Sequence, residues 1–181
     1  MKKTVSNKTD ESKIPLVGAD RVILNRVSFH LFGETEKKFS EQQWEEEVET
    51  EFKGACAYCG EEKPPFEKEH IIPINKNGLG LRHNGNIVPA CKDCNIEKRK
   101  YDRNEDGEGY IRFCIECRKK GALARIRRHM RIKGYRPVIK DKITRKRIKK
   151  LIETANKKMA LICEEYAKRI ARIIIKKEMK K

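Results

Sequence analysis

The sequence predicts an α+β protein in which a small cysteine-rich module, residues 54–103, lies between a helical N-terminal segment, residues 1–53, and a long basic helical C-terminal extension, residues 104–181. Three observations predict this organisation. Six of the seven cysteines fall into three C-x-x-C pairs, apolar residues recur every three to four positions on both sides of the module, and positive charge is concentrated in the last third of the chain.

The start of the chain carries weak signals. Residues 1–20 are polar and interrupted by Pro15 and Gly18, which predicts a loosely docked start. Residues 22–32 are apolar enough to be buried, but the run is too short to assign to a helix or a strand.

A clearer signal follows at residues 41–52, which are predicted to form an amphipathic helix. Ser40 and Gln43 have the spacing of a capping box. The apolar positions recur at i, i+4 and i+8, and they are Trp44, Val48 and Phe52. The single tryptophan is therefore assigned to the core.

The first two cysteine pairs, Cys56 with Cys59 and Cys91 with Cys94, have the spacing of a tetrahedral four-cysteine zinc site. Four thiolates suit zinc and leave no open coordination position, so such a site is structural. The gap between the pairs exceeds the roughly 15–20 residues of a plain zinc ribbon. The zinc ion is therefore expected to clamp the ends of an insert that carries another feature.

The third pair, Cys114 and Cys117, leaves two alternatives open. It is either half of a second zinc site, completed by a distant ligand or by the same pair of a second copy, or two small buried residues on a helix that begins near Tyr110. Among the histidines outside the insert's Glu-His pair, His83 is an accessory candidate for phosphate contact, His30 is expected in the core, and His129 is expected on the basic surface.

A long helix is predicted to begin near residue 144, after interruptions at Gly121, Gly134 and Pro137. Its apolar stripe comprises Ile148, Leu151, Ala155, Met159, Ile162, Tyr166, Ile170 and Ile173. Such a stripe must be covered, either by the rest of the chain or by a second copy, so a homodimer is one of two expectations.

Charge along the chain is uneven. Residues 118–181 hold 25 Lys and Arg against 5 Asp and Glu, whereas residues 1–117 hold 19 against 22. A solvated helical surface carries many charges, but an excess this large repels itself and favours an anionic partner. The phosphates of a nucleic acid are favoured over an anionic membrane surface.

Membrane insertion and secretion are not expected. No apolar run approaches the roughly 18 residues of a membrane span, and the first residues carry no apolar signal core. Repeated C-x-x-C pairs in a charged chain without a signal indicate metal binding in a reducing compartment, so a cytoplasmic location is expected.

The insert between the first two cysteine pairs contains Glu69 next to His70. Asn86 stands five residues before the second pair, and Asn95 follows it directly. Adjacent residues of a strand point to opposite faces, so one of the Glu-His pair can face a metal ion while the other faces an attacking water. This set, with Lys98 three residues further on, resembles the HNH nuclease family, in the variant whose last residue is Asn. The resemblance covers residues 54–101.

The resemblance implies a zinc-braced ββα-metal finger, two strands and a helix around one divalent cation. Glu69 and Asn95 would supply oxygen ligands to a catalytic Mg²⁺ or Mn²⁺. His70 would be the general base that deprotonates the attacking water, and Asn86 would hold His70 in orientation through a hydrogen bond. Two departures stand out: Glu occupies position 69 where Asp is commoner, and Asn occupies position 95 where many members have His.

These features together predict a metal-dependent DNA endonuclease that, as the resemblance implies, leaves 5′-phosphate and 3′-hydroxyl ends. The basic extension would bind the backbone of double-stranded DNA. The residues expected to contact DNA are Lys98, Arg99, Arg125, Arg127, Arg128 and Arg131. A dimeric restriction enzyme and a mobile-element or phage nicking enzyme are alternative settings. A non-catalytic zinc-dependent nucleic-acid-binding protein and an RNA substrate are the remaining alternatives.

Overall fold

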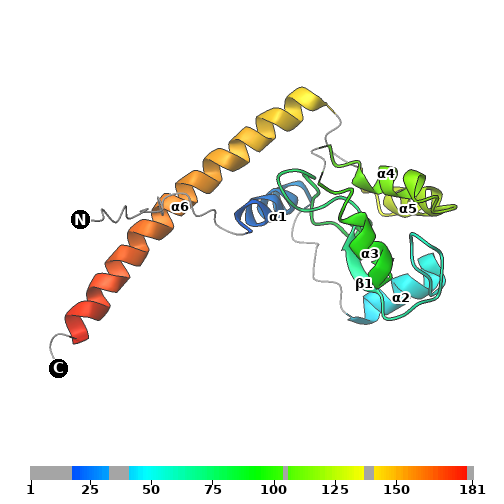
Figure 1. Ribbon diagram of the computed structural model, residues 1–181, viewed down its shortest axis with the longest axis horizontal. Coiled ribbons are helices and arrows are strands. Elements are labelled where there is room, and N and C mark those ends of the chain that lie inside the picture. The colour runs from blue at the N-terminus through cyan, green and yellow to red at the C-terminus, as the bar shows by residue number, and fades with distance from the viewer. Residues whose placement is uncertain (1–17, 33–40, 104–105, 137–140, 179–181) are drawn as a thin grey trace, which may run out of the picture.

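The computed structural model describes residues 18–32, 41–103, 106–136 and 141–178 (Figure 1). The elements in chain order are α1 (Ala19–Phe32), α2 (Glu41–Phe52), β1 (Glu67–His70), the 3₁₀ turn η3 (Asn84–Asn86), β2 (Ile87–Ala90), α3 (Lys92–Lys98), α4 (Gly109–Glu116), α5 (Ala122–Ile132) and α6 (Lys142–Glu178). The α+β class is confirmed.

The centre of the fold is a two-stranded antiparallel sheet followed at once by a helix. Strand β1 pairs with β2 in a register that places Glu69 opposite Val88 and His70 opposite Ile87. Helix α3 begins one residue after Cys91 and packs against β1. Val88 and Ala90 are fully buried, which explains why this short strand stays in the core. The order strand, strand, helix is the one that the resemblance implied.

The predicted helix at residues 41–52 is confirmed as α2, with Trp44, Val48 and Phe52 buried. Ser40 lies outside the described residues, so the predicted capping box does too. The ambiguous run at residues 22–32 belongs to α1, in which Leu24 and Ser28 are buried one turn apart. The start predicted to be loosely docked lies mostly outside the described residues.

One hydrophobic core joins the segments that the sequence divided. Its buried members include Leu24 of α1, Phe52 of α2, Val88 of β2, Phe113 of α4, Ile126 of α5 and Ile152 of α6. Tyr58 meets Phe113 edge to face, with ring centroids 5.3 Å apart. The cysteine-rich module therefore packs directly against the helices on both sides of it.

Helix α6 extends far beyond the rest of the structure (Figure 1). Helix α1 packs against it, and Ile152 is buried while Ile148 is half-buried. Further along, the large apolar side chains are exposed, among them Ile162, Tyr166, Ile170 and Ile173. Leu151 of the predicted stripe is exposed, and Ile152, which the prediction did not include, takes the buried position beside it. A second copy as cover for the distal part of the stripe stays a prediction.

A buried ionic cluster joins α2 to α5. His129, predicted to lie on the surface, is only 2% exposed. Its Nδ1 lies 2.6 Å from Oε2 of Glu51 and its Nε2 lies 3.2 Å from the carbonyl oxygen of Asn84, so both ring nitrogens face acceptors. The Lys133 ammonium pairs with Glu47 at 3.0 Å and Glu51 at 2.9 Å. Helical periodicity placed His129 among exposed arginines but did not reveal that α2 covers it.

The pKa values of the two carboxyl groups respond differently to this cluster. Burial raises the pKa of Glu47, against the opposing effect of Lys133. Burial also acts on Glu51, but hydrogen bonds from His129 and Lys133 outweigh it and lower the pKa of Glu51. The cluster therefore favours the charged form of the Glu51 carboxylate, next to the Lys133 ammonium.

Replacement of His129 by Ala is expected to destabilise the protein by about 2–3 kcal/mol, because it removes the imidazole partner of the Asn84 carbonyl and leaves the Glu51 carboxylate with Lys133 alone. The measurement is the thermal denaturation midpoint, which should fall by several degrees. Arg128→Ala, an exposed change at the neighbouring position of α5, is the control. Equal midpoints for the two variants would show that the cluster does not stabilise the fold.

Candidate functional site

The four predicted zinc ligands lie together. The sulfur atoms of Cys56, Cys59, Cys91 and Cys94 are all within 4.8 Å of one another. The backbone N–H of Cys91 donates to the sulfur of Cys56 at 3.3 Å, and a hydrogen bond from Cys94 lowers the pKa of Cys56 to about 4. Four clustered sulfur atoms, one of them favoured as a thiolate, form a donor set that can hold zinc.

Arg125 braces this cluster. Its guanidinium donates to the carbonyl oxygens of Ala57 at 3.2 Å and Tyr58 at 3.0 Å, which belong to the first cysteine turn. The side chain is half-buried and its donors satisfy backbone carbonyls, so Arg125 has a structural role, and its predicted contact with DNA stays a prediction. Arg127, Arg128 and Arg131 of the same helix are exposed, and their role in DNA binding stays a prediction.

The interface between β1 and α3 holds the predicted metal ligands. Glu67 and Glu69 are two residues apart on β1 and therefore share a face. Asn95 donates a hydrogen bond from Nδ2 to the Glu67 carboxylate, and Lys98, one turn further along α3, donates to Oε1 of Glu69 at 2.8 Å. The structure thus brings Glu69 and Asn95 to one interface, where each has a different partner.

Lys98 is fully buried in this interface. Its ammonium contacts Glu69, the carbonyl oxygen of His70 at 3.0 Å and Oδ2 of Asp102 at 2.7 Å. An ammonium has three protons, and these three acceptors use them all. The prediction that Lys98 contacts DNA is therefore wrong, whereas Arg99, which is exposed, remains a predicted DNA contact.

Burial raises the pKa of Glu69 and of Asp102, and the Lys98 ammonium opposes the rise in both. The lysine therefore acts as the counter-charge that allows two carboxylates to lie 14% and 13% exposed in the same small interface.

The oxygen atoms of this interface suit a hard divalent cation. Oδ1 of Asn95 is buried without a hydrogen-bond partner in the described structure, and Oδ1 of Asp102 is in the same condition. A buried, unpaired amide oxygen is costly unless something binds it. The carboxylates of Glu67 and Glu69 add negative charge on the same side. The residues present therefore fit Mg²⁺ or Mn²⁺.

His70 ends β1 with a half-buried side chain. Burial, followed by the positive charges of Arg21, Lys98 and Arg82, lowers the pKa of His70 to about 4. The imidazole is therefore uncharged at neutral pH and keeps a lone pair that can accept a proton.

Asn86 is fully buried and holds the segment that follows His70. Its Oδ1 accepts from the backbone N–H of Ile72, and its Nδ2 donates to the carbonyl oxygens of Ile72 and Leu81, each at 2.9 Å. Both amide protons are thus used by backbone carbonyls. The structure differs from the expected hydrogen bond to the imidazole, because the Asn86 amide bonds the backbone of Ile72 and Leu81 instead.

Two acidic residues of the site were missed by sequence reasoning. Glu67 contacts Asn95, and Asp102 contacts Lys98. The sequence spacing is consistent with both contacts. Glu67 is two strand positions from Glu69, which places both on one face, and Asp102 is four positions after Lys98, within reach of its side chain. Neither spacing is specific enough to identify a partner without the packing of α3 on β1.

The remaining candidates have structural partners. Nδ1 of His83 accepts from the Gly85 N–H at 3.0 Å, and its ring stacks on Tyr135. Cys114 is buried and Cys117 lies 3.5 Å from Oε1 of Glu97. In the described parts of the chain, Cys114 and Cys117 do not form a group of three metal-ligating side chains. A second zinc site completed by another copy stays a prediction. His30, expected in the core, is exposed.

The site and the fold around it define a ββα module that can be braced by a four-cysteine metal site. Residues 56–100 match the family model for HNH endonuclease, which confirms the resemblance for this part of the 181-residue chain and indicates a nuclease module. Helices α1, α2, α4, α5 and α6 lie outside the match. Comparison with curated proteins finds no match, and comparison with solved structures finds none either. No helix in the described residues is both long and apolar enough to cross a membrane.

Proposed function

We propose that this protein is a metal-dependent DNA endonuclease that hydrolyses phosphodiester bonds. The observation that carries the proposal is the position of His70 at the end of β1, directly after Glu69 and next to an interface in which Asn95 has a buried oxygen without a hydrogen-bond partner in the described structure. These residues lie in the segment that matches the HNH endonuclease family.

In this proposal each side chain has one task. Glu69 and Asn95 hold Mg²⁺ or Mn²⁺, which when bound stabilises charge on the phosphate and on the leaving 3′ oxygen. His70 accepts a proton from the water that attacks the phosphorus atom. Asn86 keeps His70 in place by fixing the Ile72 backbone. Breakage of the bond between phosphorus and the 3′ oxygen would leave 5′-phosphate and 3′-hydroxyl ends.

Whether the enzyme cuts one DNA strand or both depends on whether it acts as a monomer or as a dimer. The exposed apolar residues of distal α6, including Ile162, Tyr166 and Ile170, support association with a second copy, which would present two sites to a duplex. A dimer suits double-strand cleavage by a restriction enzyme, and a monomer suits a nicking enzyme. The cysteines are all unpaired thiols, which fits a reducing, cytoplasmic compartment.

The test is cleavage of supercoiled plasmid by the purified protein in Mg²⁺, in Mn²⁺ and in EDTA. We expect metal-dependent cleavage, and His70→Ala is expected to lower its rate by about 10²–10⁴-fold, because a general base contributes a factor of that size. His30→Ala, which changes an exposed histidine of α1, is the matched control. Nicked circles indicate a monomeric nickase, and linear product indicates cutting of both strands.

Retained cleavage in His70→Ala would refute the assignment of the base. Duplex binding without metal-dependent cleavage of DNA would favour a non-catalytic nucleic-acid-binding protein. Cleavage of RNA but not of DNA would show that RNA is the substrate.

A further inference from the structure

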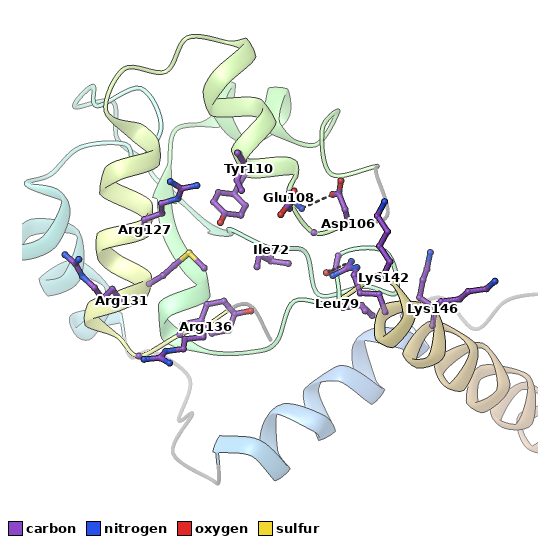
Figure 2. Close-up of a pocket in the computed structure, with 18 of the residues that line it drawn as sticks. Ile72, Leu79, Asp106, Glu108, Tyr110, Arg127, Arg131, Arg136, Lys142 and Lys146 are labelled. Carbon is purple, nitrogen blue, oxygen red and sulfur yellow. Dashed lines mark hydrogen bonds between the residues drawn. The ribbon is translucent and has the colours of Figure 1, made fainter. Parts of the chain in front are cut away.

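A large groove lies between the segment that matches the nuclease family, which contributes Ile72, Gly78 and Leu79, and the helices that follow that segment. Its volume is about 1390 Å³, and its walls come from α4, α5 and the first turns of α6 (Figure 2). The floor is apolar, with Ile72, Leu79, Tyr110 and Met130 among its lining residues. Ile72 is the residue whose backbone Asn86 holds, two positions after His70. The floor of the groove therefore includes a residue that is two positions along the chain from His70.

The rim of the groove is strongly basic. Six of its lining cations are exposed and form no ion pair with a carboxylate in the described part of the chain: Arg127, Arg131, Arg136, Lys142, Lys146 and Lys150. The lining has three acidic residues: Asp106 is paired with Arg112 at 2.5 Å, Glu153 is paired with Lys76 at 3.7 Å, and Glu108 is exposed. The positive charge of the rim is thus largely uncompensated, and it faces a concave surface.

The cations are arranged on two opposing walls. Arg127 and Arg131 are one turn apart on α5, and Lys142, Lys146 and Lys150 follow at the same interval on α6. In Figure 2, Arg127 and Arg131 lie on one side of the floor residues, and Lys142 and Lys146 lie on the other. Eight residues of helix extend about 12 Å, a length over which one DNA strand carries three to four phosphates.

The wall formed by α6 is fixed in place. Arg145, 8% exposed, donates to the carbonyl oxygens of Asn77 at 2.6 Å and Gly78 at 3.1 Å. These contacts join the start of α6 to the loop between β1 and β2. A pre-formed basic wall binds a polyanion without first losing the conformational entropy of a flexible tail.

We propose that this groove binds the phosphodiester backbone of the substrate DNA beside the cleaved bond. This inference rests on the proposed nuclease function and extends it to a surface whose cations all lie outside the family match. A rod of regularly spaced phosphates complements a concave surface with cations on both walls, whereas a flat anionic membrane does not. The groove thereby positions the duplex so that one phosphate reaches His70.

The test compares two triple variants of α6, each made in the His70→Ala background so that the DNA remains intact. Lys142→Ala/Lys146→Ala/Lys150→Ala removes three charges from the groove. Lys157→Ala/Lys158→Ala/Arg172→Ala removes three exposed charges from the distal helix and is the matched control. Binding of a fluorescent duplex is measured by anisotropy at several salt concentrations, and thermal denaturation checks that both variants fold.

The groove variant is expected to bind at least tenfold more weakly at ~0.1 M salt, with a salt slope smaller by about 2–3, because each phosphate contact contributes about 0.9 to the slope. The control is expected to change affinity by less than about twofold. Equal losses in both variants, or no loss in the groove variant, would overturn the proposal. Groove-dependent binding to anionic lipid vesicles in place of the duplex would also overturn it.

The two proposals can fail separately. If the wild-type protein does not cleave any nucleic acid but the groove variant still loses duplex affinity, the nuclease function fails and the groove remains a DNA site. If the wild-type protein cleaves plasmid and the groove variant with His70 restored binds and cuts equally well, the groove proposal alone is refuted.

Discussion

Removal of the metal ion from Cys56, Cys59, Cys91 and Cys94 is expected to unfold the protein, not merely to inactivate it. The four sulfur atoms join the segment after α2 to the junction of β2 and α3. Structural zinc contributes on the order of 10–16 kcal/mol of binding free energy in small zinc modules, which equals or exceeds the roughly 5–15 kcal/mol of net stability of a typical domain. The short strands and the seven-residue helix α3 would not persist without it.

The measurement is the circular dichroism spectrum and the thermal midpoint before and after chelation, with elemental analysis of bound zinc. Cys94→Ser should reproduce the loss of structure, because it removes one ligand. Cys163→Ser is the matched control, since Cys163 is exposed on α6. A metal-free protein with an unchanged spectrum and midpoint would show that the cysteine cluster is not required for folding.

Lys98→Met is expected to have the second-largest effect on stability, a loss of about 3–5 kcal/mol. The side chain of Lys98 is 0% exposed, and its removal leaves the carboxylates of Glu69 and Asp102 buried without their counter-charge. Lys100→Met, an exposed change two positions along the chain, should cost less than about 0.5 kcal/mol. Urea denaturation of the two variants gives the comparison.

The loss in Lys98→Met should depend on pH with a defined sign. Burial already raises the pKa values of Glu69 and Asp102 above their usual values, and removal of the lysine raises them further. The folded variant then binds protons that the unfolded chain releases, so its stability falls as pH rises above the unfolded carboxyl values near 4. The deficit relative to wild type should therefore shrink when the pH is lowered from 7 to 5. A deficit that does not change over this range would show that the carboxylates are not coupled to Lys98.

Several features follow from the sequence alone because local spacing determines them. Two C-x-x-C pairs place four thiols within reach of one metal ion wherever the chain between them returns, and the structure clusters their sulfur atoms. The i, i+4, i+8 pattern of Trp44, Val48 and Phe52 determines one apolar helix face, and α2 has the predicted bounds. The Glu-His pair and the asparagine spacing identify the nuclease family of residues 56–100.

The partners of the buried charged residues depend on the packing of segments that are distant in the sequence. Lys98 and Arg125 are cationic side chains of the kind that contacts DNA phosphates. In the structure, Lys98 compensates the charge of buried carboxylates, and Arg125 donates to the backbone carbonyls of a cysteine turn. His129 is buried because α2 covers it, and the basic groove exists because Arg145 holds α6 to the loop after β1. Charge and hydrophobic periodicity predict the helix or strand to which a residue belongs, but not the element that packs against that residue. Whether a cation meets solvent, a carboxylate or a backbone carbonyl depends on an element that lies tens of residues away, because desolvation and hydrogen bonding act between surfaces in contact.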